Sequence, residues 1–267
     1  VAANESSPPD VFQELAKKEI NKDTEYLFQK IAQNKSTPVP VLEDLFKRTK
    51  NENILKSLAE NTSTPPEILI KLTKHGSMFV HERAIKNESL PVSRLKQLMY
   101  NKEGFIMSYV ASNPKLPPED LKKMYRLSTG EFFKETIQSS LAQNPVTPAD
   151  VLDKLAKSKE PSVKRALASN PNVSDKILEK LAKDKDPDVL EAVAKNKNTL
   201  PNILAELAEK GNIKVKIAVA GNQSTNKETL EKLKKDSNSD VKNAVFSNSK
   251  FSEINAMKLE ELSKITY

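Results

Sequence analysis

The sequence predicts an all-α solenoid of about ten two-helix repeats, each about 26 residues long. The first observation behind this prediction is a series of Asn residues that recur 26 to 31 residues apart. The second is that apolar residues on both sides of each Asn follow helical spacing, not the alternation of strands. The series consists of Asn4, Asn34, Asn61, Asn87, Asn113, Asn144, Asn170, Asn196, Asn222 and Asn248.

The residues before each Asn form the first helix of the repeat. Counted from Asn170, the apolar or small residues at positions −7, −4, −3 and −2 are Val163, Ala166, Leu167 and Ala168. Residues three and four apart share one face of a helix, so this spacing predicts a short helix that ends at the Asn.

The residues after each Asn form the second helix. Counted from Asn144, positions +7, +8, +11 and +12 hold Val151, Leu152, Leu155 and Ala156. This stripe again has helical spacing and predicts a helix of about three turns with one buried face.

Thr-Pro pairs mark the start of several second helices. Thr64-Pro65 and Thr147-Pro148 place a hydroxyl at the predicted N-cap and Pro at the first helical position, where its missing N–H costs nothing. Thr64 with Glu67, and Thr225 with Glu228, fit the capping-box pattern.

The recurring Asn has a predicted structural role. Asn tolerates a left-handed backbone at a helix end, and its side chain hydrogen-bonds nearby backbone groups. Stacked copies would form a ladder that satisfies the turn amides between successive repeats.

The repeat pattern resembles that of the leucine-rich repeat variant family of bacterial-type helical repeats. The pattern V-x-x-A-V/L-A-x-N-P-x-T-P-x-x-V/I-L-x-K-L-A-K-D stands at residues 163–170 and 144–157 and is looser over residues 79–140. The resemblance implies a right-handed superhelix in which each repeat pairs an α-helix with a shorter, partly 3₁₀ helix. Some members carry a cysteine-ligated iron–sulfur module, which is not carried over because this chain has no Cys.

Two segments are longer than the regular period. They are residues 16–26 and residues 127–134, the latter reading LSTGEFFK. Insertions in repeat arrays map to loops at one edge of the stack, so both are expected to be edge loops.

Composition limits the class of protein. The chain has 267 residues, a net charge of +7 and no Cys, which excludes disulfides and thiolate chemistry. No apolar run is long enough to span a membrane. We expect one helical-repeat domain over residues 1–267, a fragment of a longer protein, monomeric and cytoplasmic. A cell-surface or secreted location stays open.

The first candidate binding surface is a basic stripe, defined by the cations ten and thirteen residues after each Asn. These two positions share one face of the second helix. The stripe predicts a site for a polyanion or an acidic partner. The alternative is a solvated face whose last-turn lysines complement the helix dipole. The candidate partner-binding cations are Lys71, Lys74, Lys123, Arg126, Lys154, Lys157, Lys180, Lys183, Lys232 and Lys235.

The second candidate is a cluster of aromatic residues and Met between residues 78 and 133. It includes Phe132 and Phe133 in the longer second insertion. Such side chains suit adaptable binding surfaces, and here they would line a groove for a partner. The alternative is that they fill a core occupied elsewhere by Ala and Leu.

Catalytic motifs are missing from the sequence. The only histidines are His75 and His81, and His75 is expected to cap a helix end. We therefore expect no catalytic residue, metal or cofactor. The predicted function is a non-enzymatic scaffold whose extended groove binds a protein or peptide. The alternative is a nucleic-acid-binding superhelix that uses the basic stripe.

Overall fold

The repeats fold as pairs of α-helices joined by a turn at the recurring Asn. The structure is a computed structural model that describes residues 4, 8–128, 130 and 133–251. Over these residues every regular element is an α-helix and no strand occurs, which confirms the predicted all-α, solenoid-type fold class. The chain divides into two units, residues 1–137 and 138–267, and the boundary lies within α10 (Lys134–Gln143).

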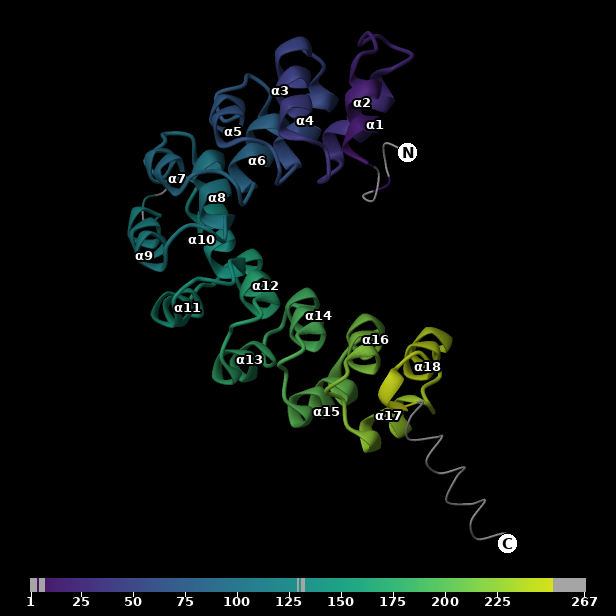
Figure 1. Ribbon diagram of the computed structural model, residues 1–267. Coiled ribbons are helices and arrows are strands. Elements are labelled where there is room, and N and C mark those ends of the chain that lie inside the picture. Colours follow the sequence, from purple (N-terminus) through teal and green to yellow (C-terminus); the bar gives the residue numbers. More distant parts are fainter. Residues whose placement is uncertain (1–3, 5–7, 129, 131–132, 252–267) are drawn as a thin grey trace, which may run out of the picture. The chain divides into compact units, whose positions relative to one another are not determined.

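Unit 1 contains two sets of helices, which occupy different layers of the stack (Figure 1). The first helices of its repeats are α2 (Glu25–Gln33), α4 (Glu52–Glu60), α6 (Met78–Lys86) and α8 (Gly104–Ser112). The second helices are α1 (Pro9–Ala16), α3 (Val39–Arg48), α5 (Pro66–Leu72), α7 (Val92–Leu98) and α9 (Pro118–Leu127).

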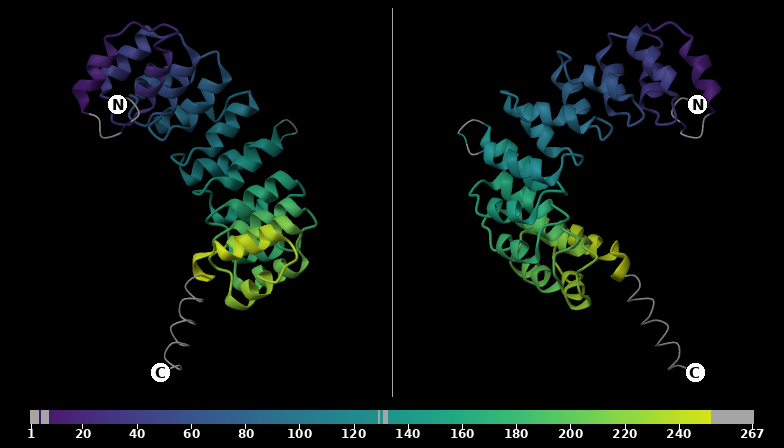
Figure 2. Two further views of the ribbon diagram at one scale, coloured as in Figure 1. Left: turned by 90° about the vertical axis from the view of Figure 1, so that its right-hand side faces the viewer. Right: turned by 60° about the vertical axis from the view of Figure 1, so that its left-hand side comes forward.

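Unit 2 has the same organisation. Its first helices are α12 (Pro161–Ser169), α14 (Pro187–Lys195), α16 (Ile213–Gly221) and α18 (Ser239–Phe246). Its second helices are α11 (Ala149–Leu155), α13 (Asp175–Leu181), α15 (Pro201–Lys210) and α17 (Lys227–Leu233). Figure 2 shows the first helices of this unit side by side.

The core of each unit lies between its two layers. In unit 2 the predicted apolar stripes meet there: Leu152 and Leu155 of α11 are buried, as are Val163 and Leu167 of α12. A buried aliphatic side chain of this size contributes about 1.5–3 kcal/mol. Because each helix has only one apolar face, a repeat is stable only when its neighbours cover that face.

The Asn ladder forms as predicted. Asn170 is fully buried, and its Nδ2 donates to the carbonyls of Ala142 and Asn144 in the preceding repeat at 2.7 and 3.0 Å. Its Oδ1 accepts from the N–H of Asn172 at 2.8 Å. The same two-carbonyl contact is made by Asn61, Asn87, Asn113, Asn196, Asn222 and Asn248.

Two details of the predicted turn are wrong. The ladder residues are not left-handed, because Asn170, for example, has φ −71° and ψ 126°, in the extended region. The Thr residues do not cap the second helix. Thr147 Oγ1 instead donates to the carbonyl of Leu141, 2.6 Å away, at the end of the preceding first helix.

The second helices begin one residue later than predicted because Pro itself takes the N-cap position. Pro65 and Pro148 precede α5 and α11, and neither helix has a side-chain cap. The capping boxes are therefore absent. In α17 the N-cap is Asn226, whose side chain accepts from the N–H of Thr229.

The helix lengths also differ from expectation. Most first helices have nine residues, whereas α5, α7, α11, α13 and α17 have seven, about two turns instead of three. The described residues contain no 3₁₀ helix, contrary to what the family resemblance implies. The first insertion forms the loop between α1 and α2, as expected. None of the described helices has the length and apolar character needed to cross a bilayer.

Candidate functional site

The lysines ten residues after each Asn are exposed, but most already have partners on the protein. Lys123 pairs with Asp120 at 3.0 Å, and Lys154 pairs with Asp150 at 3.7 Å. Lys232 lies 3.3 Å from Glu228 and 3.6 Å from Glu209. These three lysines form local ion pairs, so neighbouring carboxylates offset much of their positive charge.

The two other lysines of this row have neutral partners. Lys180 Nζ donates to the carbonyl of Ala156, 2.6 Å away at the C-terminal end of α11, and so links α13 to its neighbour. Lys71 lies over the ring of Phe46 with its Nζ 5.8 Å from the ring centre. Both contacts join a repeat to the repeat before it.

The cations thirteen residues after each Asn lie where the second helix ends. Lys74, Lys157, Lys183 and Lys235 are exposed, and none forms an ion pair with another described residue. Arg126, the fifth member, is also exposed. The predicted stripe thus consists of two different rows, one bound to the protein and one facing solvent.

Two further lysines lie close in sequence to the second row and were not among the predicted binding residues. Lys159 follows Lys157 by two residues, and Lys185 follows Lys183 by two. Both are exposed. The signal was present in the sequence as a Lys-x-Lys pattern in two successive interhelical loops.

The two aspartates of the loop between α13 and α14 are hydrogen-bonded within the protein. Asp184 Oδ2 accepts from Lys164 Nζ at 2.7 Å, and its Oδ1 accepts from the N–H of Asp186 at 2.9 Å. Burial acts to raise the pKa of Asp184, but the hydrogen bonds from Lys164 and Asp186 outweigh it and lower the pKa. Asp186 in turn caps α14 by accepting from the N–H of Asp188.

The predicted aromatic cluster divides between core and surface. Met99 and Met124 are buried, as the core-filling alternative expected. Five large apolar residues are exposed instead, and we call them the aromatic edge. They are Met78 (49% exposed), Phe79 (54%), Tyr100 (64%), Leu127 (44%) and Phe133 (48%).

The aromatic edge follows three successive junctions between a second helix and the next first helix. Met78 and Phe79 begin α6, Tyr100 lies between α7 and α8, and Leu127 and Phe133 flank the α9–α10 junction. Phe132, the other predicted residue of this insertion, lies outside the described residues.

Phe133 is fixed by its neighbour in the stack. Its φ is +61°, a conformation that bulky residues rarely adopt. Its ring lies against Gly104 at the start of α8, so closely that a Cβ at Gly104 would overlap the ring. Phe105, the next residue of α8, packs against Tyr109 with ring centres 6.0 Å apart.

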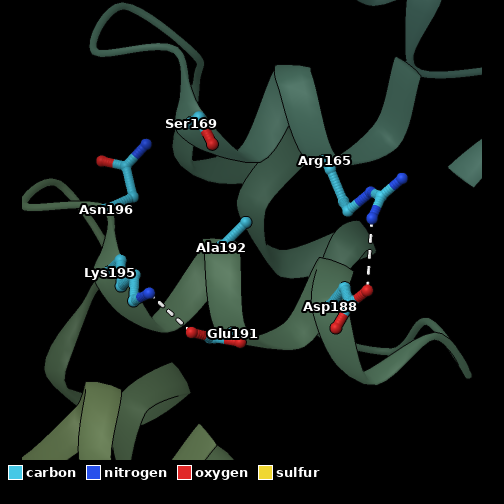
Figure 3. Close-up of a pocket in the computed structure, with 7 residues that line it drawn as sticks. All are labelled: Arg165, Ser169, Asp188, Glu191, Ala192, Lys195 and Asn196. Atoms are coloured by element: carbon cyan, nitrogen blue, oxygen red, sulfur yellow. Dashed lines mark hydrogen bonds and ion pairs between the residues drawn. The ribbon is translucent and has the colours of Figure 1, made fainter. Parts of the chain in front are cut away.

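Open hollows occur between neighbouring first helices. One, shown in Figure 3, has a volume of about 380 Å³ and lies between α12 and α14. An interhelical pair, Arg165–Asp188 at 3.2 Å, closes one side of it, and Glu191–Lys195 at 2.5 Å closes the other. A hollow at the equivalent place between α4 and α6 is also lined by acidic and basic residues. The charges in both are already paired.

Neither histidine belongs to a cluster of ligands. His75 Nδ1 accepts from the N–H of Ser77 at 3.0 Å in the turn between α5 and α6, and it caps neither helix, because the C-cap of α5 is Thr73 and the N-cap of α6 is Ser77. His81 Nε2 contacts the carbonyl of Thr73. In the part of the chain that the structure describes, no group of three His, Asp or Glu could hold a metal.

The Asn ladder, the paired apolar stripes and the 26-residue period together define the repeat type. Residues 137–197 match the family model of the Leucine Rich Repeat Variant domain. The match confirms the resemblance inferred from the sequence and covers the segment where the Leucine Rich Repeat Variant pattern is most regular.

Other comparisons give only distant similarities. No curated protein matches the chain. Among solved structures, an engineered protein is 16% identical, with 91% of each chain covered and a TM-score of 0.29. A designed armadillo repeat protein is 15% identical, with 89% of this chain and 97% of that chain covered and a TM-score of 0.24. Another, solved in complex with the peptide (KR)4, is 16% identical, with 90% and 97% covered and a TM-score of 0.21. Similarity at this level does not bear on function.

Proposed function

We propose that this chain is a non-enzymatic, monomeric scaffold that binds a protein or peptide through the aromatic edge of unit 1. The observation that carries the proposal is the position of its exposed apolar residues at three successive helix junctions. Single exposed apolar residues are normal on any protein, but a contiguous group marks an interaction site. Half of the ten exposed large apolar side chains of the described residues lie in this one edge.

The structure of the edge suits partner binding. Its residues extend from junctions between stacked helices, so the Asn ladder and the core hold their backbone in place. Phe133 is held by its contact with Gly104. Aromatic residues and Met are enriched in protein interfaces because they bury a large area at a small cost in side-chain entropy.

Nucleic-acid binding through the basic stripe is the alternative, and it has less support. Tight nucleic-acid binding requires many cations of the protein to contact phosphates together and displace the counterions condensed on them. Three of its lysines at position +10, Lys123, Lys154 and Lys232, are paired with carboxylates of the protein, which leaves fewer cations to contact phosphates.

Site-specific photo-crosslinking tests the proposal. A photoreactive phenylalanine analogue replaces Tyr100 in the edge or, as a control, Tyr26, which is 69% exposed on α2. We expect crosslinks to a protein from position 100, resistant to nuclease and abolished by Phe79→Ala with Phe133→Ala. Equal crosslinking from both positions, or loss of the product on nuclease treatment, would contradict the proposal.

A further inference from the structure

The loops that join second to first helices in unit 2 carry four lysines with no direct partner. Lys157 and Lys159 lie between α11 and α12, and Lys183 and Lys185 lie between α13 and α14. All four are exposed, and none forms an ion pair or hydrogen bond through its side chain with another described residue. We call them the lysine edge.

The charge of this edge is not balanced locally. Asp184 is held by Lys164, and Asp186 caps α14, so neither carboxylate reaches the four lysines. Lys183 faces Glu206, but that carboxylate is bound to Lys210 at 2.8 Å. Glu160 is the acidic residue of these loops that remains exposed without an ion pair among the described residues.

The two loops lie in neighbouring layers. Lys180 of α13 donates to the carbonyl of Ala156 at the end of α11, which places the ends of these helices next to each other. Lys164 of α12 likewise reaches Asp184 in the following loop. The lysine pairs are therefore about one interhelical distance apart, about 8–10 Å.

We propose that the lysine edge binds an extended acidic peptide segment with carboxylates about three residues apart. A peptide in the polyproline II conformation advances about 3.1 Å per residue with three residues per turn, so every third side chain lies on the same face and advances by about one layer of the stack. Acidic side chains at that interval meet successive lysine pairs. The proposal rests on the proposed function and names the partner chemistry that unit 2 recognises.

A single nucleic-acid strand fits the edge less well. Binding of single strands combines cations with aromatic platforms for the bases, and no aromatic residue stands in these two loops. The exposed carboxylate of Glu160 also lies within the first loop and would repel a continuous phosphate chain more than a peptide with spaced carboxylates.

Fluorescence anisotropy on the full chain tests the proposal. The probe is a labelled peptide of about twelve residues that repeats Glu-Thr-Ser, spaced to match the layers. A second peptide of the same composition has its Glu residues adjacent, and an oligothymidine strand is the third probe. We expect the spaced peptide to bind more tightly than either, and to weaken as salt rises from about 50 to 150 mM.

Two quadruple variants identify the surface. Replacing Lys157, Lys159, Lys183 and Lys185 by Gln should weaken binding of the spaced peptide about tenfold or more, since each exposed charge pair contributes a modest factor. The matched control replaces exposed lysines elsewhere in unit 2 and changes the net charge equally. Its sites are Lys176, Lys197, Lys214 and Lys227.

The outcomes are distinct. An equal loss in both variants would show that only net charge matters and would overturn the proposal. So would tighter binding of the adjacent-Glu peptide or of oligothymidine. Because none of these lysines belongs to the aromatic edge, failure here leaves the crosslinking result at position 100 unaffected.

Discussion

At the residue scale, one ladder Asn side chain binds three backbone groups, two of them buried. For Asn170 these are the carbonyls of Ala142 and Asn144 and the N–H of Asn172. A buried polar group that loses its partner costs more than the hydrogen bond itself contributed. The ladder is therefore expected to be sensitive to substitution at every rung.

Asn170→Ala should lower the free energy of unfolding by about 1–3 kcal/mol, because three polar groups lose their partner. Asn170→Asp should cost more at neutral pH, since a carboxylate would face two carbonyl oxygens, and protonation at low pH should recover part of the loss. Chemical denaturation at several pH values measures both. A neutral effect of Asn170→Asp would mean that the ladder does not stabilise the turn.

Asp184 should make stability depend on pH. Its pKa is lowered in the folded protein, so the unfolded chain binds more protons in the acid range. The contribution is present above the ordinary pKa of Asp, about 4, and is lost as the pH falls through the lower folded pKa.

Asp184→Asn should therefore cost about 1–3 kcal/mol at pH 7 and flatten the loss of stability in acid. Urea unfolding between about pH 2 and 7 measures this effect. Asp150→Asn is the control, because its pair with Lys154 is about half exposed on both sides and should matter little. An unchanged acid slope in Asp184→Asn would refute the assignment.

The sequence predicts the ladder well but not the contacts of the Thr residues. The Asn period shows which residues stack, and a buried Asn in a turn has few choices of partner. The hydroxyl of Thr147 has two kinds of candidate partner, the N–H groups of the helix that follows it and the carbonyl of Leu141 in the helix before it. Only the path of the chain through Pro148 decides between them.

At the element scale, the contact between Gly104 and Phe133 links α8 to the loop before α10. Gly104→Ala would place a methyl group where the ring lies. The substitution displaces Phe133, whose positive φ is unfavourable without that support.

A Trp at position 133 reports on this contact, because the chain has no other Trp. Adding Gly104→Ala to the Phe133→Trp variant should shift the Trp fluorescence emission to longer wavelength and increase its quenching by iodide, because the displaced side chain is more exposed to water. Gly130→Ala is the control, since nothing lies within 4 Å of a Cβ there. Equal spectra in the presence and absence of the methyl group at position 104 would contradict the contact.

In the candidate sites, helical periodicity predicts which side chains are exposed but not which of them are paired. Periodicity predicts that Lys154 and Lys157 share one face of the second helix; both are exposed, but α11 ends at Leu155 and Lys157 lies in the loop after it. Periodicity cannot tell that Asp150 holds Lys154 while Lys157 stays unpaired, because that depends on rotamers and on the neighbouring repeat. The exposure of Phe79 and Tyr100 likewise depends on which junction each residue occupies.

At the scale of the whole molecule, stability should be distributed over nearest-neighbour contacts. Residues 134–267, which begin with α10 and include all of unit 2, should fold on their own because their repeats cover one another. Circular dichroism and a cooperative urea transition of this fragment provide the measurement. A fragment without cooperative unfolding would show that unit 2 needs unit 1.

Within that fragment, Leu155→Ala should cost about 2–5 kcal/mol, as truncation of a buried Leu does. A cost of the same size in the full chain would show that the unit is stabilised locally. A much smaller cost in the full chain would mean that contacts outside unit 2 compensate, contrary to a nearest-neighbour array.

The regular spacing of the ladder Asn residues in unit 2 bears on which changes in the length of the coding sequence preserve their hydrogen bonds. Asn196, Asn222 and Asn248 each bind the carbonyl of an Ala two residues before the preceding Asn. Excision of residues 171–196 would leave Asn222 facing Ala168 and Asn170, which offer the same carbonyls as the lost pair. Loss or gain of one whole repeat would thus keep the hydrogen bonds of the ladder, and small insertions in the loops keep them too, as the 27-residue spacing between Asn34 and Asn61 shows. Natural selection on the number of repeats can therefore lengthen or shorten a binding surface while the fold is preserved.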